Sequence, residues 1–77
     1  EGVEHTPLTG EQRTAIAGVR TFYQAKLAEM EVLHQSSLRR TPDPEAQATL
    51  ERDYRHERER LVAEREARIA RIRAGQA

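Results

Sequence analysis

Large apolar side chains recur at every third or fourth position between residues 9 and 40, and no proline interrupts this stretch. Most of the successive heptad core positions are apolar: Ile16, Val19, Tyr23, Met30 and Leu33. Lys26 and Ser37 complete the heptad series, and Phe22 and Leu27 widen the stripe. This is the spacing of one helical face and not the alternation of a strand. We predict a helix over residues 9–40, with Thr9 as its N-cap.

A second apolar pattern follows the proline-containing segment Thr41-Pro42-Asp43-Pro44. The prolines disfavour helical backbone in the residues before them, so the first helix must end here. Asp43 or Thr41 can cap the next helix, and Pro44 suits its first turn. The second stripe is thinner: Leu50, Tyr54, Leu61, Val62, Ile69 and Ile72. We predict a turn over residues 41–44 and a helix over residues 45–74 that stops at Gly75.

Two helices of about thirty residues joined by a short turn predict an all-α fold. The expected architecture is an antiparallel two-helix hairpin of the coiled-coil type over residues 9–75, and two hairpins can pair into a four-helix dimer. Residues 1–8 are predicted as a flexible arm and 76–77 as a tail. If facing residues have numbers that sum to about 85, the apolar pairs are Ile16 with Ile69, Tyr23 with Leu61 and Val62, and Met30 with Tyr54.

Composition narrows the classes of function. Among 77 residues, 13 are Lys or Arg and 13 are Asp or Glu, so the formal net charge is zero. Contact with nucleic-acid phosphates needs a basic excess, and we therefore expect no direct nucleic-acid binding. No run approaches the roughly eighteen apolar residues of a membrane span. So short a chain buries little surface alone, so we expect it to dock on a larger protein or to form a homodimer.

Candidate chemistry is sparse along the chain. It has no cysteine, and its histidines, His5, His34 and His56, are not spaced for a shared ligand site. We therefore expect surface histidines, no metal and no cofactor. Ser36 and Ser37 follow His34, but a two-helix rod offers no pocket that excludes water. The expectation is a protein that is not an enzyme.

Two surfaces remain as candidates for binding a protein partner. The first is the tip, an exposed end made rigid by two prolines: Arg40, Asp43, Glu45, Ala46 and Ala48. The second is the seam, the apolar line along the two helices: Tyr23, Met30, Tyr54, Leu61 and Val62. Residues 51–73 are heavily charged and predict either a solvated helix with pairs such as Glu51–Arg55 and Glu64–Arg68, or a charged docking face.

Three segments carry a family resemblance: Leu8-Thr9-Gly10-Glu11-Gln12, Pro42-Asp43-Pro44-Glu45-Ala46-Gln47-Ala48, and the return helix from Arg58 to Gly75. Over residues 8–75 the chain resembles the coiled-coil hairpin of the DksA/TraR family of RNA polymerase-binding regulators. In that family the hairpin enters the polymerase secondary channel, and acidic tip residues act near the catalytic centre. The resemblance implies a cytoplasmic transcription regulator whose first acidic tip residue is Asp43. The second acidic position falls on Ala46, beside Glu45, and the small tip residue falls on Ala48. The zinc finger of that family has no counterpart here.

The opening segment also resembles the LTxxQ motif of the Spy/CpxP-like periplasmic helical proteins, which form dimeric cradles and include heavy-metal sensors. That resemblance implies a periplasmic chaperone, or a sensor of stress or metal. The chain starts at Glu1 without a methionine, so we expect a processed chain or a fragment, in the cytoplasm or in the periplasm. A third interpretation is a small structural subunit of a larger assembly. The favoured one is a non-enzymatic protein-binding module that docks on a larger partner, resembling the transcription regulator that binds RNA polymerase through its tip.

Overall fold

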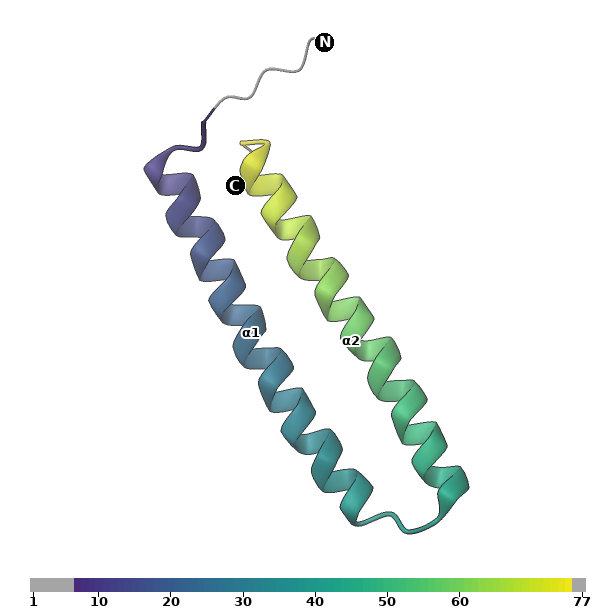
Figure 1. Ribbon diagram of the computed structural model, residues 1–77. Helices are drawn as coiled ribbons and strands as arrows, with labels where there is room; N and C mark the ends of the chain where they lie inside the picture. The colour runs from purple at the N-terminus through teal and green to yellow at the C-terminus, as the bar shows by residue number, and fades with distance from the viewer. Residues whose placement is uncertain (1–6, 76–77) are drawn as a thin grey trace.

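The structure is a computed structural model that describes residues 7–75. Two α-helices, α1 over Gly10–Arg39 and α2 over Pro44–Arg73, run antiparallel and are joined by a short turn (Figure 1). The rod measures 55 × 26 × 16 Å. The predicted all-α hairpin is confirmed, and the helix ends lie within one residue of the expected ones. Most of the predicted arm (residues 1–6) and the tail (residues 76–77) lie outside the described residues.

Side-chain caps fix where each helix begins. The backbone N of Gln12 donates to the Thr9 hydroxyl at 3.0 Å, and the Thr9 backbone N donates to Gln12 Oε1 at 2.8 Å. This reciprocal capping box satisfies two N–H groups that the helix leaves unpaired. Of the two candidate caps of α2, the structure uses Asp43, whose Oδ2 accepts from the Ala46 backbone N at 2.9 Å. Pro44 follows at the first helical position, where its missing N–H costs nothing.

Contacts between the helices confirm the predicted register. At the open end, Gln12 Nε2 donates to the carbonyl oxygen of Ile72 at 3.0 Å. Near the turn, His34 Nε2 lies 3.3 Å from Glu51 Oε1. Both pairs have residue numbers that sum to about 85, so one register holds along the whole rod. Neither helix of the described chain is long and apolar enough to cross a membrane.

The interior is a single narrow row of side chains. Its buried members within residues 7–75 are Ile16, Tyr23, Leu61, Ile69 and one polar residue, His34. Two helices can enclose only the line along which they touch, so the other apolar side chains of residues 7–75 keep more contact with water.

The heptad assignment of the α1 interior is wrong at two positions. The heptad series places Leu33 and Lys26 on the face towards α2, but Leu33 is 61% exposed and Lys26 is also exposed. Leu27 and His34 take the inward places. A straight helix has 3.6 residues per turn, so its inner face drifts by about 20° per heptad. From Ile16 the inward position reaches His34 after about five full turns, one residue beyond the heptad position.

Candidate functional site

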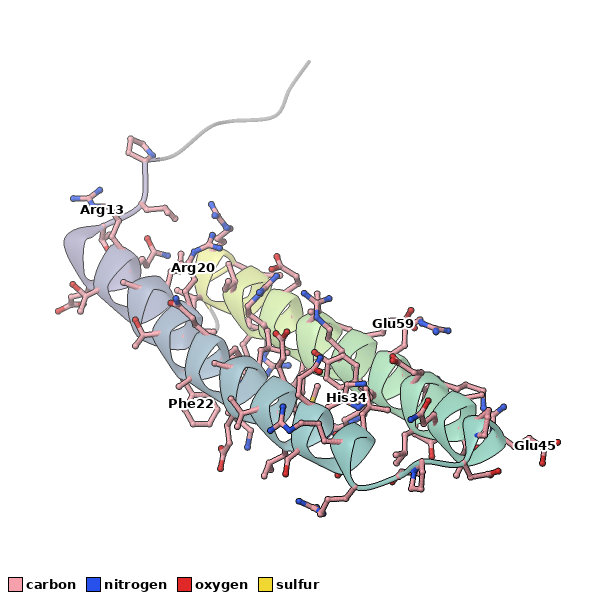
Figure 2. All side chains as sticks on the ribbon, turned by 60° about the horizontal axis from the view of Figure 1, so that its bottom comes forward. Arg13, Arg20, Phe22, His34, Glu45 and Glu59 are labelled. Carbon is pink, nitrogen blue, oxygen red and sulfur yellow. The ribbon has the colours of Figure 1, made fainter. Side chains whose placement is uncertain are left out.

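The tip holds the five predicted tip residues together at the closed end of the rod. The Asp43 carboxylate is used as the cap of α2. The Arg40 guanidinium donates to Ser36 Oγ on the last turn of α1. Glu45 and Ala48 are exposed, Ala46 is half-buried, and Figure 2 shows Glu45 pointing away from the end of the hairpin. The tip therefore presents the Glu45 carboxylate outward, while Asp43 has a structural role.

Hydrogen bonds tie the turn to both helices. Gln47 Nε2 donates to the carbonyl oxygen of Thr41 at 2.6 Å. The Thr41 hydroxyl donates to the carbonyl oxygen of Ser37 at 2.8 Å. Because the turn residue Thr41 is bonded to each side, the tip is stiffened by these contacts as well as by its two prolines.

The seam residues line the contact between the helices. Tyr23 and Leu61 are buried, whereas Met30, Tyr54 and Val62 are half-buried. They come together as the register predicts, but mainly to form the interior of the hairpin itself. Only the edge of the seam is open to a partner.

That open edge is a groove of about 510 Å³ along one side of the hairpin. We call it the Tyr23 groove. Its floor is apolar: Tyr23, Met30 and Leu61. Its α1 wall consists of Phe22, Lys26, Glu29 and Leu33. Its α2 wall consists of Glu57, Arg60, Glu64 and Arg68.

The α1 wall exposes large apolar side chains. Phe22 is 50% exposed and, with Leu33, stands at the border of the groove. Figure 2 shows Phe22 projecting from α1 away from α2. Lys26 lies beside it, with Nζ 5.6 Å from the centre of the Phe22 ring. Sequence reasoning missed this wall, although Phe22 and Leu33 are separated by about three helical turns and therefore share one side of α1.

Charges of both signs line the groove in equal number, with three cations and three carboxylates on its walls. Arg60 Nε donates to Glu57 Oε1 at 3.2 Å, and Arg60 Nη2 donates to Glu57 Oε2. This hydrogen-bonded pair lowers the pKa of the Glu57 carboxyl and raises the pKa of the Arg60 guanidinium. The Arg68 guanidinium carbon lies 5.5 Å from the centre of the Tyr23 ring and closes one end of the floor.

The Tyr23 hydroxyl is a polar group in this apolar floor. The side chain is only 1% exposed, and its oxygen has no hydrogen-bond partner among residues 7–75. Burial raises the pKa of the Tyr23 hydroxyl, and the Glu64 carboxylate, which approaches the hydroxyl without reaching hydrogen-bond geometry, raises that pKa further. Leaving a buried donor unpaired costs roughly 1–3 kcal/mol, so the hydroxyl is a cost to the fold and not a support.

His34 is not the surface residue that the sequence predicts. It is 9% exposed, and its ring stacks on Tyr54 with centroids 4.0 Å apart and planes 5° apart. Its Nε2 contacts Glu51, so the carboxylate reaches across to α1. Within residues 7–75, neither of the predicted pairs Glu51–Arg55 and Glu64–Arg68 is found among the ion pairs.

The other histidines give no site. His56 is exposed, and His5 lies outside the described residues. Over residues 7–75, no three His, Cys, Asp or Glu side chains gather closely enough to hold a metal ion.

No protein-family model, curated protein or solved structure matches this chain. The two family resemblances therefore stay predictions.

Proposed function

We propose that this chain is a non-enzymatic interaction module, a rigid helical hairpin that docks on a larger protein. The observation that carries the proposal is the distribution of apolar side chains. Among residues 7–75, only four of them are buried between the helices, while Phe22, Val32 and Leu33 are exposed to water. Exposed large apolar side chains that cluster on one element are typical of protein-binding surfaces.

The tip is the part of the rod best suited to enter a cleft in a partner. It is narrow, it is held by hydrogen bonds from both helices, and it presents Glu45 outward. The proposal extends to RNA polymerase as the partner on the strength of the tip sequence alone. A transcription regulator of this kind acts in the cytoplasm and contacts the enzyme through acidic tip residues.

The test separates the charge of Asp43 from its capping role. Asn caps a helix about as well as Asp, whereas Ala does not. Asp43→Asn therefore leaves the helix content unchanged and removes only the carboxylate. If the chain alters transcription by purified RNA polymerase through this charge, Asp43→Asn abolishes that effect, and Asp53→Asn on the exposed side of α2 does not.

Two results would contradict the tip proposal. One is a chain that has no effect on transcription and does not bind purified polymerase. The other is an effect that survives both Asp43→Asn and Glu45→Gln, since no tip carboxylate would then be involved. Circular dichroism of each variant verifies that the hairpin is still folded.

A second candidate function, a periplasmic chaperone or stress sensor, is favoured by the exposed α1 wall. Phe22 and Leu33 offer apolar surface to an unfolded client, and the charges around them keep the rod in solution. Such a protein slows the aggregation of a denatured client, and Phe22→Ser reduces that protection. A client that aggregates at the same rate with and without the chain would exclude this candidate.

A further inference from the structure

The α1 wall of the Tyr23 groove carries a symmetric pattern of side chains. Phe22, Lys26, Glu29 and Leu33 follow one another at intervals of four, three and four residues. This is the spacing by which two helices pack side by side. The order is apolar, basic, acidic, apolar. If the same wall on an antiparallel helix faces this one, each charge therefore meets an opposite charge and each apolar side chain meets an apolar side chain.

We propose that a second copy of this chain docks on this wall, with the two α1 helices antiparallel. The twofold axis passes between Leu27 and Ala28, midway along the pattern. Phe22 of each copy then lies against Leu33 of the other, and Lys26 of each copy meets Glu29 of the other. One axis satisfies all four contacts at once, as an isologous interface requires.

The apolar members of the wall supply the attraction. Phe22 is 50% exposed and Leu33 is 61% exposed in the single hairpin, so both have surface to remove from water. Met30 lies in the groove floor on the same part of α1 as Leu33 and is half-buried. The Phe22 ring of the second copy covers both side chains when it reaches Leu33.

Charge complementarity selects a second copy over other occupants. The groove walls carry equal numbers of cations and carboxylates, so a uniformly acidic or basic surface gains no net attraction there. The same wall of an antiparallel second copy instead pairs Lys26 of each copy with Glu29 of the other. Lys26 already lies along the Phe22 ring, 5.6 Å from its centre, at the border where the second copy arrives.

The interface is separate from the tip. It spans about three turns of α1, so it buries less than the roughly 800 Å² per partner of a standard interface, and the dimer is weak. Because the two hairpins are antiparallel, their tips point in opposite directions and stay exposed. The inference goes beyond the proposed function, and the dimer can fail while tip docking holds, or the reverse.

Sedimentation of the full chain from roughly 10 µM to 1 mM tests the dimer, since this range covers weak association. Lys26→Glu and Glu29→Lys each place like charges opposite one another and weaken dimerisation at least about tenfold. The double variant restores opposite pairs and recovers the original association. Glu31→Lys leaves the association unchanged and serves as the control, because Glu31 is exposed and lies about two and a half helical turns from Phe22, on the opposite side of α1 from the wall.

Cysteine cross-linking tests the alignment, because the chain has no cysteine of its own. The Phe22→Cys variant mixed with the Leu33→Cys variant forms a covalent heterodimer on oxidation, because the mixed pair still has one intact contact of Phe22 with Leu33. Phe22→Cys alone does not, because the two copies of residue 22 lie roughly 16 Å apart along the antiparallel helices.

Four results overturn the inference. They are a chain that stays monomeric up to about 1 mM, a dimer that tolerates both single charge reversals, a double reversal that does not restore association, and a covalent dimer of Phe22→Cys alone. Circular dichroism confirms in each case that the variants fold.

Discussion

Two polar rings, those of Tyr23 and His34, occupy places in the interior where an aliphatic side chain would pack more simply. Part of the free-energy cost of burying the polar His34 ring is offset, because the ring lies flat on Tyr54 and its Nε2 contacts Glu51. Tyr23 gains from burying its ring but has no partner for its hydroxyl among the described residues. These two residues therefore stabilise the hairpin through their ring surfaces more than through polar contacts.

Replacing Tyr23 by Phe therefore stabilises the hairpin. The ring stays buried, and removing the unpaired hydroxyl raises the free energy of unfolding by about 1 kcal/mol at neutral pH. Chemical denaturation measures the change. Tyr54→Phe, which removes a hydroxyl from a half-buried ring, is the matched control and gives no comparable gain. A Phe variant less stable than the wild type would show that the Tyr23 hydroxyl finds a bond in solution.

The same residue makes the stability depend on pH in the alkaline range. The pKa of the Tyr23 hydroxyl in the fold is raised above the ordinary value of about 10, first by burial and then by Glu64. The unfolded chain therefore loses this proton at a lower pH than the folded chain. The contribution of Tyr23 to stability is constant below about pH 10 and is lost as the pH rises through the raised value. Denaturation curves from neutral to alkaline pH measure this loss, and the part due to Tyr23 is absent from Tyr23→Phe.

At the scale of the elements, α1 and α2 have equal length but unlike surfaces. Large apolar side chains remain exposed on α1, whereas α2 presents charged residues to water along most of its length. The caps, the prolines and the interruption at residues 41–43 made the two helices predictable, because these signals are local. The inward face of α1 was less predictable, since a heptad count and a 3.6-residue turn diverge by one residue between Ile16 and His34.

Gly18 is the weak point of α1, and its replacement by Ala stabilises the helix. A Cβ at this position meets no atom within 4 Å, so the change brings no clash. The free energy of unfolding rises by about 1 kcal/mol, because the backbone of the unfolded chain has less freedom. This corresponds to a rise in Tm of roughly 5 °C. Calorimetry measures the shift. Gly75→Ala is the matched control with the opposite sign, because Gly75 ends α2 with φ at +80°.

At the scale of the whole molecule, stability depends on very few side chains. For a chain of this size, the low end of the usual stability per residue gives a free energy of unfolding of roughly 4 kcal/mol. Leu61 is buried at the middle of the rod, and Leu61→Ala costs about 2–5 kcal/mol, which removes most of that total. Far-ultraviolet circular dichroism of dilute protein is expected to show a largely unfolded chain. Leu33→Ala, the same change at an exposed position, keeps the helical signal.

The candidate sites were predictable to different degrees, for physical reasons. The position of the tip follows from Pro42 and Pro44 alone, and its residues gather as expected. The Tyr23 groove could not be predicted, because it depends on which side of the thin seam each charged residue of α2 falls. That geometry is set by packing between the helices and not by the spacing within either one.

The hairpin register also sets an order in which its contacts can form. The contact of His34 with Glu51 closes a loop of 17 residues, whereas the contact of Gln12 with Ile72 closes one of 60 residues. Loop-closure entropy makes the longer closure costlier by about 1 kcal/mol. The contacts beside the turn therefore form first, and the helix ends at the open end of the hairpin separate first. A partner that binds at the Gln12–Ile72 end would therefore separate the two helices more easily there than at any other part of the rod.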